Sequence, residues 1–315
     1  MFPSLRHAPR AEILAAATSV VVSVVLLGMK FTAFYLTDSA AIFSDALESI
    51  VNVIASLVAT YSLLLAHQPA DAQHPYGHGK AEFLSAGFEG GMILVAAAVI
   101  AFRAVEEMIT GPGAHTLDVG LILVAIAGAV NGAVGVLLLQ AGRRRGSIAL
   151  VADGKHLLSD AITSAAVLIA LILMWLQPAW TWIDPIAALL VAAYITVMAL
   201  GLLSQSTAGL MDRQDARDDK LLRDILDAHV NGASEPRICS YHKLRHRHSG
   251  RYHWVDFHVM VPATQDVRRG HEIASAIEHE IERALGEGNA TAHVEPCGDG
   301  ACARCGSGSS RMQRE

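Results

Sequence analysis

Long apolar stretches fill the first two thirds of the chain, and short polar segments separate them. A membrane-spanning helix needs about 20 mainly apolar residues. Six segments reach that length: 12–36, 40–66, 82–110, 117–142, 148–176 and 180–207. The pattern predicts an α-helical membrane protein with six transmembrane helices over this region.

From Asp218 onward the pattern is that of a small α+β domain. Two segments place their apolar residues on one helical face, and three alternate as strands do. The predicted elements are a helix over 219–229, strands over 237–245 and 252–261, a helix over 269–285 and a strand over 289–295. This order predicts a sheet with helices packed on one face.

The composition changes at the same place. The 315 residues are 52% hydrophobic and only 17% charged, below the roughly 25% of a soluble domain. The formal net charge of -6 leaves 15 His out of account, so it indicates no nucleic-acid partner. We expect a membrane domain over 1–211, a cytoplasmic α+β domain over 212–296 and a Cys/Gly-rich flexible tail over 297–315.

Basic residues predict the orientation in the bilayer. Arg6 and Arg10 precede the first segment, Lys80 follows the second, and Arg143–Arg145 follow the fourth, whereas the other three loops have no Lys or Arg. Because cytoplasmic loops are enriched in Lys and Arg, we expect both termini in the cytoplasm and the protein in the inner (plasma) membrane.

Two of the apolar segments carry metal-liganding residues one helical turn apart: Glu48 with Asn52, and His156 with Asp160. Residues four apart lie on one helix face, and a charge at the bilayer centre costs between about 2.5 and 17 kcal/mol. His156 alone would be a hydrogen-bonded core histidine. Two carboxylates, an imidazole and an amide oxygen suit a divalent first-row metal, and a tetrahedral arrangement favours zinc. Asp45 is interpreted as a packing or ligand-orienting group, with direct ligation as the alternative.

The third and fourth segments are rich in glycine. Small residues let membrane helices approach closely, so we interpret these positions as helix contacts. They are Gly87, Gly90, Gly91, Gly128, Gly132 and Gly135.

The loop after the second segment reads His-Pro-Tyr-Gly-His-Gly-Lys-Ala-Glu over 74–82. Together with the six spans, the His-x-x-x-Asp over 156–160 and the α+β domain, this string resembles the cation diffusion facilitator family, of the bacterial ferrous-iron/zinc efflux type. The resemblance covers residues 10–296. It implies a homodimeric divalent-metal/proton antiporter whose transport site is Glu48, Asn52, His156 and Asp160. Glu48 and Asn52 depart from the family pattern, which has Asp or His and then Asp.

The resemblance also implies two further metal sites and a ferredoxin-like, metallochaperone-like cytoplasmic domain. A loop site would comprise Asp71, His74 and His78, although a Pro/Gly turn with solvated His remains the alternative. Lys80 would pair with Asp212 at the domain hinge. A cytoplasmic binuclear site that senses metal and holds the dimer would comprise His242, His258, His271, His293 and Glu295.

The last third of the chain contains further histidines and cysteines. We expect the other histidines there, His246, His248, His253 and His279, to be solvated surface groups. Three cysteines, Cys297, Cys302 and Cys305, form Cys-x4-Cys-x2-Cys in a Gly-rich tail. This spacing suits a binding site for zinc or a soft metal that lacks one ligand, and free thiols are an equal alternative.

These features predict a secondary transporter that exports a divalent transition metal and exchanges it for protons. Zinc is the expected substrate and regulator, and Fe²⁺, Co²⁺, Ni²⁺ and Mn²⁺ are alternatives. A metal-dependent membrane enzyme is a rival, but the chain has no His-Glu-x-x-His string, so we expect no enzyme. A membrane-anchored metal sensor is the other rival, and it leaves Glu48, His156 and Asp160 without a reason to lie in lipid.

Overall fold

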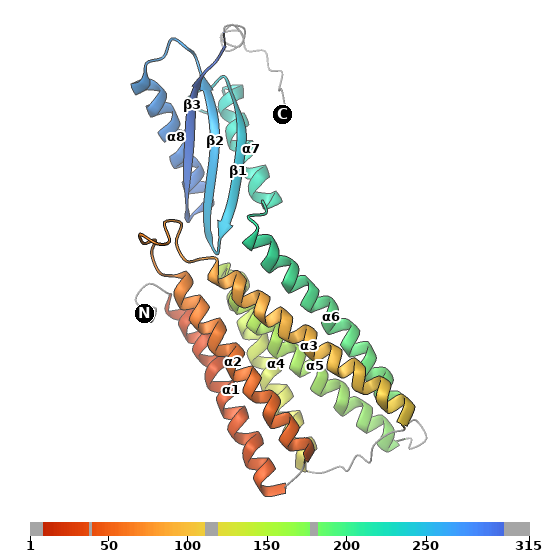
Figure 1. Cartoon of the computed structure of the whole chain (residues 1–315). Helices are drawn as coiled ribbons and strands as arrows, with labels where there is room; N and C mark the ends of the chain where they lie inside the picture. The colour runs from red at the N-terminus through yellow and green to blue at the C-terminus, as the bar shows by residue number, and fades with distance from the viewer. Residues whose placement is uncertain (1–8, 38–39, 111–118, 177–181, 299–315) are drawn as a thin grey trace. The chain divides into compact units, whose positions relative to one another are not determined.

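The structure, a computed structural model, describes residues 9–37, 40–110, 119–176 and 182–298 (Figure 1). The chain divides into two compact units, Met1–Leu210 and Met211–Glu315. We call them the membrane unit and the sheet unit. Both chain termini and the three loops predicted without Lys or Arg lie largely outside the described residues.

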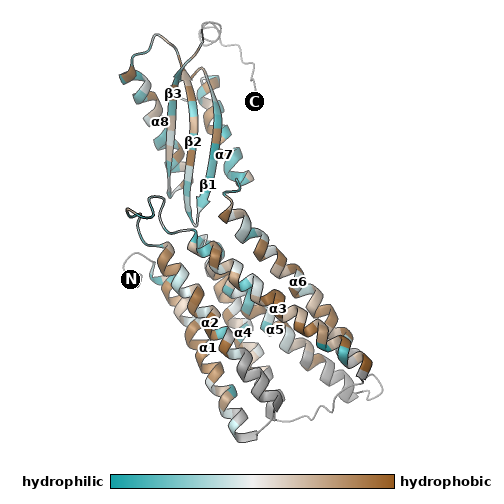
Figure 2. Ribbon diagram, viewed as in Figure 1, coloured by the Kyte–Doolittle hydropathy of each residue, from teal (hydrophilic) through white to brown (hydrophobic). Residues whose placement is uncertain are grey.

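The membrane unit contains six long helices within the described ranges. They are α1 (Arg10–Thr37), α2 (Ala40–Ala66), α3 (Ala81–Thr110), α4 (Val119–Arg145), α5 (Ile148–Leu176) and α6 (Ile183–Leu210). Their bounds lie within three residues of the predicted segments. Four of them are long and apolar enough to cross a membrane, over Arg10–Thr32, Ala81–Glu106, Ala125–Arg145 and Pro185–Leu210. Figure 2 shows the predominance of hydrophobic residues along these helices. This unit is a helical transmembrane domain.

Glycines bring the helices of the membrane unit into close contact, as their spacing predicts. A Cβ atom at Gly154 of α5 would lie 2.7 Å from the backbone nitrogen of Leu139 and 2.9 Å from the carbonyl oxygen of Gly135, both on α4. A Cβ atom at Gly90 of α3 would lie 3.1 Å from Leu202 of α6. Gly91 differs, because a Cβ atom there would meet nothing within 4 Å.

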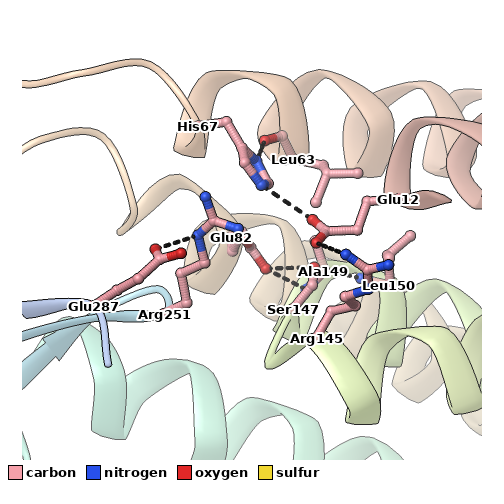
Figure 3. Close-up of polar contacts among 10 residues, drawn as sticks. All are labelled: Glu12, Leu63, His67, Glu82, Arg145, Ser147, Ala149, Leu150, Arg251 and Glu287. Carbon is pink, nitrogen blue, oxygen red and sulfur yellow. Dashed lines mark hydrogen bonds and ion pairs between the residues drawn. The ribbon is translucent and has the colours of Figure 1, made fainter. Parts of the chain in front are cut away.

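A buried polar network joins the ends of several membrane helices (Figure 3). His67, at the end of α2, hydrogen-bonds through Nδ1 to the Leu63 carbonyl oxygen at 2.8 Å. Its Nε2 lies 3.1 Å from the Glu12 carboxylate of α1, and both side chains are only 2% exposed. Glu82 of α3 accepts hydrogen bonds from the Ser147 hydroxyl at 2.6 Å and from the Ala149 backbone N–H at 3.2 Å. These contacts fix α1 to α2 and α3 to the start of α5.

Over residues 211–298, the described part of the sheet unit has three strands and two helices. Its elements are α7 (Ala216–Asn231), β1 (Ser240–Ser249), β2 (Tyr252–Val261), α8 (Val267–Leu285) and β3 (Gly288–Pro296). The strand order is β1-β2-β3, with β1 antiparallel and β3 parallel to β2. Asp215 and Asp266 cap the two helices by accepting backbone N–H bonds, which stabilises their first turns.

Both helices cover the same face of the sheet, which we call the helix-covered face. The core contains Leu222 and Leu226 of α7, Ile273, Ile277 and Ile281 of α8, and alternate residues of β2 that include Val255, Phe257 and Val259. Side chains of a strand point alternately to its two sides. Asp256 and His258 therefore belong to the opposite, open face.

A β-bulge in β1 changes which side chains reach each face. His242 pairs with His258, but Arg245 pairs with Asp256, so three residue steps on β1 oppose two on β2. Lys243 within the bulge has a φ of 51°. A one-residue insertion reverses the facing of everything beyond it. His242 accordingly shares the open face with His258, whereas His246, which pairs with Val255, lies on the helix-covered face.

The glycine contacts lead to a paired test of helix packing. Gly154→Ala should lower the unfolding temperature, because two backbone atoms of α4 stand where the methyl group would go, and such overpacking costs about 1–3 kcal/mol. Gly91→Ala is the matched control, which should leave stability unchanged or raise it by about 0.5–1 kcal/mol through helix propensity. Thermal unfolding of the two detergent-solubilised variants measures this difference, and equal stability would contradict it.

Candidate metal centres

The predicted transport site brings α2 and α5 together. Asn52 of α2 donates a hydrogen bond from Nδ2 to Oδ2 of Asp160, at 2.8 Å. The Asn52 amide oxygen lies 3.0 Å from Nε2 of His156. His156 is 6% exposed. The structure therefore unites three of the four predicted residues through contacts between helices far apart in the sequence.

The fourth predicted residue, Glu48, lies one turn before Asn52 on α2, and its side chain is outside the described residues. The same holds for the side chain of Asp45. His156 also has a buried Nδ1 that makes no hydrogen bond within the described part of the chain. Imidazole, carboxylate and amide groups in contact form a donor set that suits a divalent transition metal as transported substrate.

The loop between α2 and α3 gathers the second predicted set of ligands. Asp71, His74 and His78 each offer a ligand atom, and these atoms lie within 4.8 Å of one another. Nε2 of His78 lies 3.1 Å from Nδ1 of His74 and 3.5 Å from Oδ2 of Asp71. Hydrogen bonds from the backbone N–H of His74, above all, and of Gln73 lower the pKa of Asp71. The loop thus holds an ionised carboxylate beside two imidazoles.

A third cluster occupies the open face of the sheet, with ligands from all three strands. Glu295 of β3 lies 2.7 Å from Nδ1 of His258 and 3.0 Å from Nε2 of His242. His293 is more distant, with its Nε2 3.8 Å from the same carboxylate. The hydrogen bond from His258 is the largest cause that lowers the pKa of Glu295. Four of the five predicted cytoplasmic residues therefore meet around one carboxylate.

His271 stands apart from this cluster in the single chain. It is exposed on α8, and among the described residues it makes no hydrogen bond or ion pair with the other four. Lys80 donates to the carbonyl oxygen of Leu210 at 3.3 Å, and Asp212 accepts from Arg247 at 3.2 Å. A Lys80–Asp212 pair would join the two units and stays a prediction.

Of the three cysteines in the predicted Cys-x4-Cys-x2-Cys motif, the structure describes only Cys297. Cys297 is buried, and its Sγ lies 3.4 Å from that of Cys239. Cys302 and Cys305 lie outside the described residues, so their metal-binding role stays a prediction.

The predicted solvation of three histidines is wrong. His246 is 5% exposed, and His248 and His253 both contact Asp218. For two of them the cause is local, because the predicted strand ended at Arg245, whereas β1 runs to Ser249 and includes His246 and His248. His253 lies on the second predicted strand, and its contact with Asp218 of α7 depends on the tertiary structure. His279 is exposed, as expected.

The structure also reveals buried acids that the sequence reasoning passed over. Asp153 of α5 and Glu89 of α3 are fully buried. Oδ1 of Asp153 and both carboxylate oxygens of Glu89 have no hydrogen-bond partner among the described residues. The signal was available, because an ionisable residue inside an apolar helix is a functional candidate by default.

Comparison with known proteins identifies the family. Residues 16–211 match the family model described as the cation efflux transmembrane domain, and residues 224–297 match the cytoplasmic domain of cation efflux proteins. This chain belongs to the cation diffusion facilitator family. Its helical unit is an integral membrane transport domain, and the chain is a cation efflux transporter rather than an enzyme.

Individual relatives span nearly the same length. A protein described as an uncharacterized transporter from Synechocystis sp. is 37% identical over 284 residues, which cover 90% of each chain. Cation-efflux pump FieF of Shewanella oneidensis is 28% identical, over 90% of this chain and 93% of its own. FieF of Pectobacterium atrosepticum is 30% identical, over 92% and 94%.

The geometry of the open-face cluster predicts that mutation of Glu295 removes the stabilisation of the sheet unit by zinc. Zinc that binds only the folded state should stabilise the sheet unit, by about 2.7 kcal/mol at 100 times the dissociation constant. Glu295→Gln should remove that stabilisation, because the cluster loses the carboxylate that two histidines contact. Thermal unfolding with and without zinc measures the effect. Glu272→Gln, on the exposed side of α8, is the control and should respond to zinc as the wild type does.

Proposed function

We propose that this chain is a homodimeric secondary transporter of the inner membrane that exports a divalent transition metal from the cytoplasm in exchange for protons. Zinc is its first expected substrate. Six transmembrane helices would surround the path, and both termini would lie in the cytoplasm. The domains would divide at 211/212 into a transport part and a cytoplasmic part for metal sensing and dimerisation.

The observation that supports this proposal is the contact of Asn52 with His156 and Asp160. These polar groups lie on two helices of a membrane domain, where each would cost free energy without a partner. The amide group of Asn52 contacts both neighbours, through its nitrogen to Asp160 and through its oxygen to His156. A dication would take its place among the same atoms, with Glu48 as the additional carboxylate.

Coupling to protons follows from the chemistry of the ligands. A histidine must be neutral and a carboxylate ionised before either can bind a metal, so binding releases protons and protonation releases the metal. Rocking of helix bundles around a site near the bilayer midplane is the usual form of alternating access. Such a cycle needs only that the protonated and metal-bound forms favour opposite orientations.

Metal identity rests on the same ligands. One imidazole with two carboxylates and an amide gives a larger share of oxygen than the usual zinc ligands of Cys and His. This set accommodates Fe²⁺, Co²⁺, Ni²⁺ and Mn²⁺ as alternatives. Metal-by-metal flux into proteoliposomes under an imposed pH gradient would establish the preference.

Regulation is assigned to the open-face cluster of His242, His258, His293 and Glu295, with His271 as a further predicted ligand. Metal that binds one arrangement of the dimer better than another shifts the population toward it. The match of residues 224–297 to a dimerisation domain of cation efflux proteins supports this role.

The transport assignment predicts that Asp160→Ala abolishes metal uptake into inverted vesicles while folding and dimerisation persist. The variant removes the carboxylate that Asn52 contacts and leaves a dication with too little negative charge. Thr163→Ala on the same helix is the matched control, since the Thr163 hydroxyl donates to the backbone carbonyl oxygen of Asp160 and the substitution keeps the Asp160 carboxylate. Normal uptake by Asp160→Ala would show that the transport site lies elsewhere.

The regulatory assignment predicts a different kinetic result for His258→Ala. Its uptake should require a higher cytoplasmic metal concentration for half activation, whereas the maximal rate at a fixed proton gradient should stay near that of the wild type. A metal titration separates the two quantities. A reduced maximal rate with an unchanged midpoint would place His258 in the transport step instead.

A further inference from the structure

We propose that Asp218, His248 and His253 form an additional divalent-metal site on the helix-covered face of the sheet unit. This site is separate from the transport site, from the loop cluster and from the open-face cluster. It does not depend on the proposed transport mechanism.

Three elements place its side chains. Asp218 lies in the first turn of α7, His248 near the end of β1 and His253 at the start of β2. His248 and His253 are a directly opposed pair in the antiparallel ladder, and their ring centroids are 4.3 Å apart. The register of the hairpin and the start of α7 therefore bring the three side chains together.

The ligand atoms converge on one carboxylate oxygen. Oδ2 of Asp218 lies 2.9 Å from Nε2 of His248 and 3.0 Å from Nδ1 of His253. One ligand atom from each residue lies within 4.8 Å of the other two. Zinc lies near 2.0–2.2 Å from nitrogen and oxygen ligands. The three ligand atoms would therefore need to move apart only slightly for an ion to bind between them.

A neighbouring histidine gives an independent indication of a ligand. His246 lies on the same face of β1 as His248 and is 5% exposed. Both of its ring nitrogens are buried, and neither makes a hydrogen bond among the residues that the structure describes. Buried polar atoms without partners are rare in native proteins. A metal with its bound water beside His246 would supply the missing partner.

Burial is the largest influence on the pKa of both His253 and His246. Burial, above all, and the neighbouring His248 lower the pKa of His253, although Asp218 opposes them. Burial likewise lowers the pKa of His246 against the opposing effect of Asp218 and Asp219.

The donor set identifies the class of metal. Two imidazole nitrogens and one carboxylate oxygen, with a position left for water or for His246, suit Zn²⁺ and also Fe²⁺, Co²⁺ or Ni²⁺. The carboxylate and two histidines lack the oxygen-rich shell that Ca²⁺ and Mg²⁺ prefer.

The site would attach the beginning of α7 to the β1–β2 hairpin. Asp218 follows α6 closely in the chain, and Arg247, beside His248, already binds Asp212 in the same segment at 3.2 Å. A metal at Asp218 would therefore hold the segment that follows the membrane unit against the sheet. The open-face cluster lies across the sheet, so one ion cannot serve both.

Cobalt binding by the full-length, detergent-solubilised chain tests the proposal. Co²⁺ substitutes for Zn²⁺ and reports its ligands through visible absorption. Asp218→Asn and His253→Gln should each bind one Co²⁺ fewer per chain than the wild type and lose part of the absorption. His279→Gln, which alters an exposed histidine of α8, should bind as many ions as the wild type.

Two further measurements keep the outcomes distinct. Asp160→Ala should lose a different ion, so the Asp160→Ala/Asp218→Asn double variant should bind two ions fewer than the wild type. If the transport assignment is wrong, Asp218→Asn should still bind one ion fewer. Circular dichroism and gel filtration report folding, and if His253→Gln does not fold, the isosteric Asp218→Asn decides. Wild-type cobalt stoichiometry and absorption in folded Asp218→Asn would overturn the proposal and leave the cluster as an ion pair.

Discussion

The structure depends on one constraint: ionisable side chains that are buried away from water need polar partners. Such groups in the membrane unit are stabilised by a partner on another helix, and Asn52 provides one for both His156 and Asp160. The same requirement explains the pair of Glu12 with His67 and the hydrogen bonds to Glu82.

Glu89 and Asp153 extend the constraint beyond the predicted ligands. Asp153 lies on α5, in the turn before His156, and is fully buried. Glu89, on α3, is subject to electrostatic repulsion from Asp153. Buried carboxylates of this kind are costly unless they are paired or protonated. Their proximity to the α2–α5 contact makes the transport site part of a larger polar interior.

The sheet unit shows how one backbone irregularity separates two groups of histidines. Without the bulge between His242 and Arg245, the even-numbered positions 242, 246 and 248 would share one face of β1. With it, His242 meets His258 and Glu295 on the open face, while His246 and His248 lie beneath α7. The two clusters are thereby held apart by the sheet itself.

Much of this protein follows from its sequence alone. Apolar segment length predicts the membrane helices, alternation predicts the sheet elements, and the string over 74–82 with the His-x-x-x-Asp indicates the family, because each of these signals is local in the chain. The partners of Asn52 and the ligands around Glu295 could be proposed from spacing, but their contacts depend on packing between distant segments. The burial of His246 and the contacts of His248 and His253 with Asp218 could not be predicted from the sequence, since they depend on the extra residue in β1 and on where α7 crosses the hairpin. Only the tertiary structure decides such placements, because a one-residue change of register reverses every side chain that follows it.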